Sequence, residues 1–251
     1  MRKRQLPTVG RNAAAAAAHG LEEVFALSKR RLMFSKLNMA KFISHLDLLR
    51  CFTRSIMRSG LPVKYSQGFN PHQKITFSLP LSIGVTGERE CVDIDFEERA
   101  SNAEIMERLN QNLPPDIRII SVGTPVQSAN DIVSAEYEIN LISDEPINSA
   151  DVEEFFGRDE VIILKKTKKK GEQPANLMDF VKGCTIEKSD ETEDGFLIKL
   201  RLILSAGGQS NLKPEIAVKA LADNIKPKIT AYDINRSRIF CMADGILQEF
   251  D

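Results

Sequence analysis

The order of patterned segments between residues 31 and 122 is the feature that most constrains the fold. A short strand-like segment at Arg31–Lys36 comes first, and a helical pattern, two further strand-like segments, a second helical pattern and a closing strand follow it. Strands are indicated by apolar residues at every second position and helices by apolar residues three or four positions apart. The resulting order is βαββαβ. It is typical of a ferredoxin-like unit, with both helices on one face of an antiparallel sheet.

The first helix has a clear start signal and a clear stop signal. Ser44 is a good N-cap residue, Asp47 follows it three positions later, and Gly60 is a typical C-terminal stop. These signals predict a helix over residues 45–59. The apolar residues expected on its buried side are Leu49, Phe52 and Ile56.

A similar succession begins again at Ser134. The predicted elements there are an alternating strand through Leu141, helices at Ser149–Phe156 and Pro214–Ala222, and strands at Val161–Leu164, Phe196–Leu204 and Ile229–Ile234. We therefore predict an α+β protein made of two ferredoxin-like (βαββαβ) halves with antiparallel sheets. The predicted organisation is a disordered or basic and alanine-rich tail (1–28), a ferredoxin-like domain with a basic face (29–127) and a second ferredoxin-like half (133–251).

Composition narrows the class of protein. No apolar run approaches the roughly 20 residues that a membrane helix needs, and the mean hydropathy is −0.22. The four cysteines are isolated in the sequence, so neither a zinc-ligand pair nor an iron–sulfur motif is present. We expect a cytoplasmic protein that holds no metal or cofactor and does not contact a membrane. The cysteines are Cys51, Cys91, Cys184 and Cys241.

Positive charge is concentrated in residues 24–87, which contain ten lysines and arginines and one acid, Asp47. Three of the arginines, Arg50, Arg54 and Arg58, recur every four residues and so share one face of the first helix. Most such stripes are simply solvated. Guanidinium groups aligned in this way can also bind phosphates or carboxylates, and the scarcity of acids favours a binding role here.

Other residues extend this basic surface in the predicted site. Lys41, Lys64 and Lys74 flank the arginines, and Tyr65 is a candidate for stacking on a base. A second basic run at Lys165–Lys170 includes Lys168 and Lys169. Such a run is more often a solvated hairpin tip, and its importance depends on whether it lies near the arginines.

Two histidines fall inside the basic block. His45 begins the first helix, His72 lies in a loop bounded by glycine and proline, and Asp47 is close in sequence to the first of them. Together they are weak candidates for acid–base catalysis or a weak metal site. We place structural or phosphate-contacting roles ahead of catalysis for both histidines, because no spacing in the sequence forces them together.

The segments Phe42–Arg50 and Tyr65–Lys74, with residues 31–36 and 77–84, resemble the radical-SAM-linked protein family. Members of that family occur beside or fused to radical-SAM proteins that often carry a cobalamin-binding domain. The resemblance implies an accessory role and a radical-SAM partner, and it supplies no reaction. Gln73 stands where the family pattern has proline.

Three hypotheses of function follow. The leading one is an accessory RNA-binding protein, acting on tRNA or rRNA together with a radical-SAM modification enzyme, and not a self-contained enzyme. The second is a protein-docking subunit that grips the radical-SAM partner without contacting nucleic acid. The third is a histidine-dependent RNA-processing enzyme, which rests on fold analogy alone.

Overall fold

The computed structural model describes residues 29–97, 100–167 and 171–251. The predicted tail at 1–28 and the lysines 168 and 169 lie outside these residues. The first unit has the predicted order of elements. They are β1 (Lys29–Lys36), the 3₁₀ turn η1 (Asn38–Phe42), α2 (His45–Ser59), β2 (Ile75–Phe77), β3 (Val85–Asp95), α3 (Asn102–Asn112) and β4 (Ile117–Gly123).

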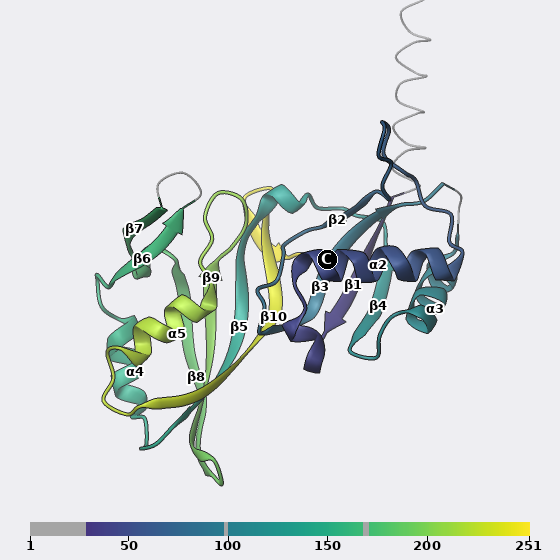
Figure 1. Cartoon of the computed structure of the whole chain (residues 1–251). Helices are drawn as coiled ribbons and strands as arrows, with labels where there is room; N and C mark the ends of the chain where they lie inside the picture. The colour runs from purple at the N-terminus through teal and green to yellow at the C-terminus, as the bar shows by residue number, and fades with distance from the viewer. Residues whose placement is uncertain (1–28, 98–99, 168–170) are drawn as a thin grey trace, which may run out of the picture.

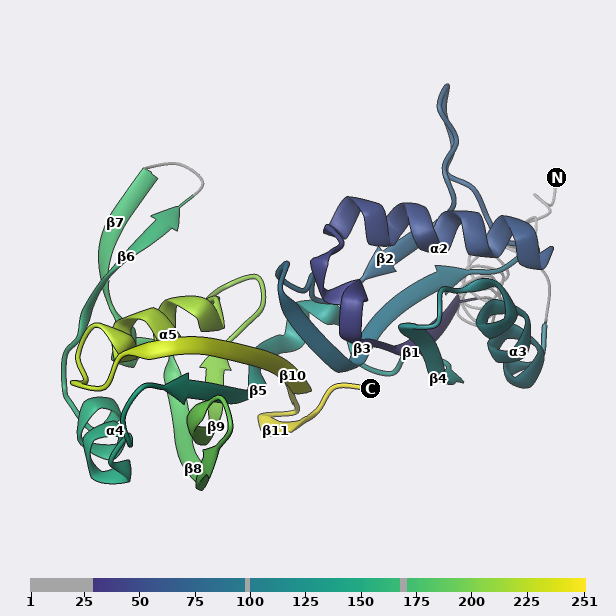
Figure 2. The same cartoon turned by 60° about the horizontal axis from the view of Figure 1, so that its bottom comes forward.

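The strands of this unit pair antiparallel in the order β4-β1-β3-β2. Both helices lie on the same side of this sheet (Figure 2). Residues of α2 and α3 enter a single core together with β1, β3 and β4. The ferredoxin-like arrangement expected from the sequence is therefore present in the first unit.

The second unit repeats the arrangement, with its strands in the order β10-β5-β9-β8. Its elements are η2 (Ala129–Asp131), β5 (Ile132–Ser143), α4 (Ser149–Phe156), β8 (Val181–Thr192), β9 (Gly195–Ser205), α5 (Pro214–Ala222), β10 (Ile229–Ala243) and β11 (Ile246–Glu249). Both helices of this unit enter one core with β5, β9 and β10. The short strand β11 pairs only with the end of β10 among the described strands.

One element of the second unit differs from the prediction. The segment predicted as its second strand forms β6 (Ile162–Thr167), which pairs with β7 (Gly171–Asn176) in a separate two-stranded sheet. The turn η3 (Leu177–Asp179) follows, and β8 takes the expected place in the main sheet. The sequence pattern does not reveal β8, because charged residues interrupt the apolar alternation along this outermost strand.

The two units share one nine-stranded sheet (Figure 1). They join where Ile234–Arg236 of β10 pairs in parallel with Val85–Gly87 of β3. We call this junction the seam. Every other strand pair in the described residues is antiparallel, so the two predicted antiparallel sheets form one sheet with a short parallel junction. The domain boundaries at 127 and 133 concern independent folding and stay a prediction.

The helix α2 is the element that positions the candidate site. The hydroxyl of Ser44 accepts a hydrogen bond from the Asp47 amide, and Gly60 ends the helix in a left-handed conformation (φ 68°) that favours glycine. Phe52 and Ile56 are buried as predicted, and Leu48 occupies the place in the core that was predicted for Leu49. The opposite face of α2 is left to solvent.

Candidate nucleic-acid interface

The predicted arginine stripe lines an open hollow at the surface of α2. Arg50, Arg54 and Arg58 are all exposed. They border a hollow of about 440 Å³, which we call the arginine hollow. Its remaining lining residues are Asp47, Cys51 and Pro114. The helical spacing and the α3–β4 turn together therefore bring three guanidinium groups to one place with a single carboxylate.

The arginines of the hollow differ in what holds them. Arg50 forms an ion pair with Asp47 (Nη1–Oδ1 2.9 Å) on the same helix. Arg58 donates hydrogen bonds to the main-chain oxygen of Asn112 and to the hydroxyl of Ser55. In the described part of the chain no carboxylate forms an ion pair with Arg54 or with Arg58. The hollow thus keeps an excess of positive charge.

The one carboxylate of the hollow is held in its charged form. Hydrogen bonds from the Ser44 hydroxyl and from Arg50 keep the pKa of Asp47 below its ordinary value. Asp47 is therefore ionised at neutral pH, and it neutralises one of the three guanidinium groups.

A projecting loop rises beside α2, between the end of that helix and β2 (Figure 2). We call residues 62–74 the finger. Single strand-like bridges join Val63 to Phe96 at its base and Tyr65 to Gln73 further out. Phe69, in the loop beyond these bridges, is fully exposed, and Tyr65 is 45% exposed. Two aromatic rings are therefore available to solvent on the finger.

The buried side chain of Gln73 helps to close the finger. Its amide nitrogen lies 3.4 Å from the Tyr65 hydroxyl. Gln73, which stands where the sequence resemblance led us to expect proline, thus has a structural contact of its own.

Two of the predicted basic residues are neutralised by acids. Lys41 forms an ion pair with Asp233 of the second unit (2.6 Å), and Lys74 lies 3.9 Å from a carboxylate oxygen of Asp95. Lys64 is half-buried near the base of the finger, where its amide bonds to the Asp95 carbonyl. Lys41 therefore contributes to the contact between the units more than to an open binding surface.

The two histidines have different neighbours. The ring of His45 packs edge-on against Phe77, with 5.2 Å between ring centroids. Its Nδ1 atom is buried and has no hydrogen-bond partner in the described chain. His72 is exposed on the finger, where its Nδ1 atom lies 2.9 Å from the Ser66 hydroxyl. No contact between described residues brings the imidazoles together as a catalytic pair would require, and their assignment as catalytic stays a prediction.

Sequence reasoning missed a buried polar cluster at the seam. Glu90 of β3 receives hydrogen bonds from two nitrogens of Arg236 of β10, and the second of these nitrogens also donates to the Leu79 carbonyl. Lys36 and Tyr137 complete the cluster, and all four of its side chains are buried. Burial lowers the pKa of Lys36 and raises that of Tyr137. The cluster links the two units, and strand pairing between segments this distant leaves no local sequence signal.

The described residues contain no group of histidine, cysteine, aspartate or glutamate side chains arranged to hold a metal ion. None of the described helices is long and apolar enough to cross a membrane.

Residues 29–214 match the bacterial family DUF2344, whose description is an uncharacterized protein conserved in bacteria. The chain belongs to this family. The DUF2344 match covers the first unit and the second as far as the start of α5, so it includes both the arginine hollow and the finger. No curated protein matches the chain.

Three solved structures share a distant likeness with this DUF2344 protein. The Cbf5–Nop10–Gar1 complex aligns with 86% of this chain and 50% of its own at 11% identity and a TM-score of 0.47. Two further structures align to a similar extent. An H/ACA ribonucleoprotein bound to a substrate RNA containing 2′-deoxyuridine aligns with 87% of this chain and 49% of its own at 10% identity and a TM-score of 0.45. The archaeal box H/ACA Nop10–Cbf5 complex aligns with 86% of this chain and 49% of its own at 12% identity and a TM-score of 0.43. This chain spans about half the length of the chains it matches. Likeness at this level says nothing about what it binds.

Proposed function

We propose that this DUF2344 protein binds RNA through the arginine hollow and the finger, and that it serves as an accessory to a radical-SAM modification enzyme. The observation that carries the RNA part is the charge of the hollow, where Arg50, Arg54 and Arg58 face one carboxylate. The radical-SAM part rests on the sequence resemblance of segments between residues 31 and 84 alone.

The geometry supports a phosphate backbone as the ligand. The arginines lie about one turn apart along α2, so their Cα atoms follow one another at about 6 Å along the helix axis, and all three guanidinium groups border the same hollow. Each group offers paired donors that match phosphate oxygens. The exposed rings of Tyr65 and Phe69 add stacking surfaces that tolerate any base. The ligand favoured by this combination is an RNA with unpaired nucleotides.

Salt-dependent binding tests the proposal. The purified full chain is titrated with bulk tRNA and with unstructured oligouridine over a range of salt concentrations. The combined substitution of Arg50, Arg54 and Arg58 by alanine removes three candidate phosphate contacts. Each contact to single-stranded nucleic acid contributes about 0.7 to the slope of log affinity against log salt, so the slope should fall by about 2.

The matched control removes three exposed lysines of the second unit, Lys182, Lys226 and Lys228, and changes the net charge equally. It should leave the slope nearly unaltered. If neither RNA binds at low salt, or if both triple variants lose affinity to the same degree, specific RNA binding at the hollow is excluded.

A second candidate function, docking of an acidic protein surface, is favoured by one specific observation. The large apolar side chains of Leu46 and Met57 on α2 are 62% and 66% exposed, and Phe42 of η1 is 56% exposed. Apolar side chains mixed with arginine are typical of the centre of a protein interface. A radical-SAM partner that copurifies after nuclease treatment, with no crosslinked RNA, would favour this function over RNA binding.

A further inference from the structure

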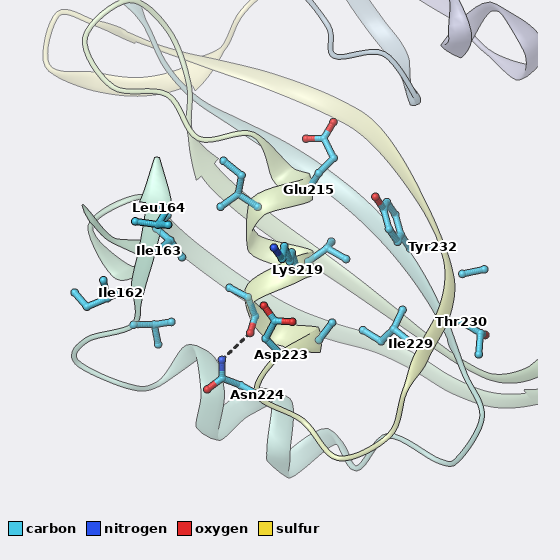
Figure 3. Close-up of a pocket in the computed structure, with 16 residues that line it drawn as sticks. Ile162, Ile163, Leu164, Glu215, Lys219, Asp223, Asn224, Ile229, Thr230 and Tyr232 are labelled. Atoms are coloured by element: carbon cyan, nitrogen blue, oxygen red, sulfur yellow. Dashed lines mark hydrogen bonds between the residues drawn. The ribbon is translucent and has the colours of Figure 1, made fainter. Parts of the chain in front are cut away.

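The second unit carries a large open groove, well away from the arginine hollow. It has a volume of about 1020 Å³ and lies between β6, α5 and the first residues of β10 (Figure 3). Side chains of α5 lie between the two strands in this view. Among the labelled residues, Leu164 belongs to β6, Lys219 to α5 and Tyr232 to β10.

Both strands that border the groove have an unpaired edge there. In the described chain, β6 pairs with β7 and with no other strand. Residues 229–233 of β10 pair with β5 on one side, and pairing with β3 on the other side begins only at Ile234. Residues 162–164 of β6, with Val161 just before them, and residues 229–232 of β10 line the groove, so main chain as well as side chains borders it. An unpaired strand edge is a template for another extended chain.

The walls of the groove are apolar, and its ionised groups are mostly acidic. Ile162, Leu164 and Tyr232 are 58%, 64% and 52% exposed, which is unusual for large side chains gathered in one place. The charged residues that line it are Glu215, Asp223 and one base, Lys219. One carboxylate oxygen of Glu215 is buried without a hydrogen-bond partner among the described residues. Asp223 also caps the C-terminal end of α5, where the helix dipole is negative.

We propose that this groove binds an extended peptide segment of another protein, which adds as a strand along the open edge of β10 or β6. The segment carries apolar side chains at alternate positions, for the groove walls, and basic side chains that meet Glu215 and Asp223. An extended chain fits because it satisfies the free main-chain groups of the strand edge, whereas a bound helix has already paired its own. The proposal goes beyond RNA binding and does not depend on it.

The probe is a fluorescein-labelled peptide in which valine and lysine alternate, titrated into the full chain and followed by fluorescence anisotropy. Two matched peptides accompany it. One is N-methylated at every second residue and so loses strand hydrogen bonds, and the other carries glutamate in place of lysine. Hydrogen exchange on the complex reports which amides the peptide protects.

We expect the valine–lysine peptide to bind and to slow exchange at residues 162–164 or 229–232. Its two matched peptides should bind at least about tenfold more weakly. Leu164→Lys and Tyr232→Lys introduce like charge at exposed positions, and each should weaken binding by about tenfold, as expected for a central contact. Val126→Lys is the control, since Val126 is 89% exposed and lies outside the groove.

Several results would overturn the proposal. They are absence of binding by the valine–lysine peptide, equal binding of the N-methylated peptide, and equal loss of affinity in the Val126→Lys control. Hydrogen exchange is also measured without the peptide. Slowed exchange at the groove that increases with protein concentration would identify a second copy as the occupant. Protection that disappears on deletion of residues 1–28 would identify the chain's own N-terminal segment, and protection by RNA alone would identify nucleic acid. A second copy, the N-terminal segment or RNA in the groove would each contradict the proposal that a peptide of another protein binds there. None of these outcomes tests RNA binding at the arginine hollow.

Discussion

Removal of one partner from the buried ion pair at the seam gives the sharpest test of how the two units are held together. Glu90 and Arg236 are about 4% and 3% exposed, and Arg236 Nε lies 2.8 Å from a Glu90 carboxylate oxygen. Glu90→Leu would leave the Arg236 guanidinium buried without its counter-charge. Breaking a buried pair in this way costs about 3–5 kcal/mol.

The double variant separates the value of the pair from the cost of an orphaned charge. Arg236→Met alone would strand the Glu90 carboxylate and should cost a similar amount. In Glu90→Leu with Arg236→Met both charges of the pair are gone, and apolar replacement of a buried pair is often neutral or stabilising. The buried Lys36 then loses the attraction of Glu90 together with the repulsion of Arg236, so the two effects on its ammonium group oppose each other. The double variant should therefore lie within about 2 kcal/mol of the native protein, far from the sum of the single losses.

Urea denaturation followed by far-ultraviolet circular dichroism measures these free energies, because the chain has no tryptophan to report by fluorescence. The exposed pair Glu104–Arg108 on α3 is the control. Its coupling should be no more than about 0.5 kcal/mol. If Glu90→Leu costs less than about 1 kcal/mol, or if the single losses add in the double variant, the pair does not hold the seam. A transition that splits in two after a single substitution would show that the units unfold separately once the seam is weakened.

Three further predictions concern Asp47, Phe69 and a pair of buried cysteines. Asp47→Asn removes the only carboxylate among the described residues that line the arginine hollow, and it should steepen the salt dependence of oligouridine binding by about 0.7, one additional phosphate contact; an unchanged slope would contradict the charge argument. Phe69→Ala should leave the thermal unfolding temperature unaltered and weaken oligouridine binding by about 1–3 kcal/mol, the value of one stacked base; equal affinity would remove the finger from the interface. Burial raises the pKa of Cys91 to about 12 and that of Cys184 to about 11. At neutral pH both thiols should therefore react far more slowly with iodoacetamide than a free thiol, with rates that rise with pH; rapid labelling seen by mass spectrometry would contradict this.

Local signals in the sequence located most of the helices. Ser44 and Gly60 set the two ends of α2, and the predicted bounds of α4 and α5 agree with the structure. Caps and helical periodicity act over a few residues, so a sequence displays them directly. The strand β8 escaped prediction for the opposite reason, since its place is fixed by pairing with β9 and not by an apolar pattern of its own.

The sequence predicted that the three arginines of the candidate site share one face of α2. It did not predict which of the surrounding basic residues are neutralised by acids. The four-residue spacing alone places Arg50, Arg54 and Arg58 on one face. Which basic residues stay free depends on partners far away in the sequence, such as Asp233, which neutralises Lys41 from the second unit. The buried Glu90–Arg236 pair depends in the same way on the parallel junction of β3 with β10.

The seam also bears on the accessory role proposed above. The arginine hollow belongs to the first unit and the groove bordered by β6 and β10 to the second, and a single sheet with a buried ion pair connects the units. Ligands bound at the two places would therefore be held at a fixed separation and orientation. Gly87 of β3 leaves room for the buried ion pair of the seam, because a side chain there would collide with the Glu90 carboxylate. If both proposals hold, the chain would hold an RNA on one unit and a partner peptide on the other without either site having to perform chemistry.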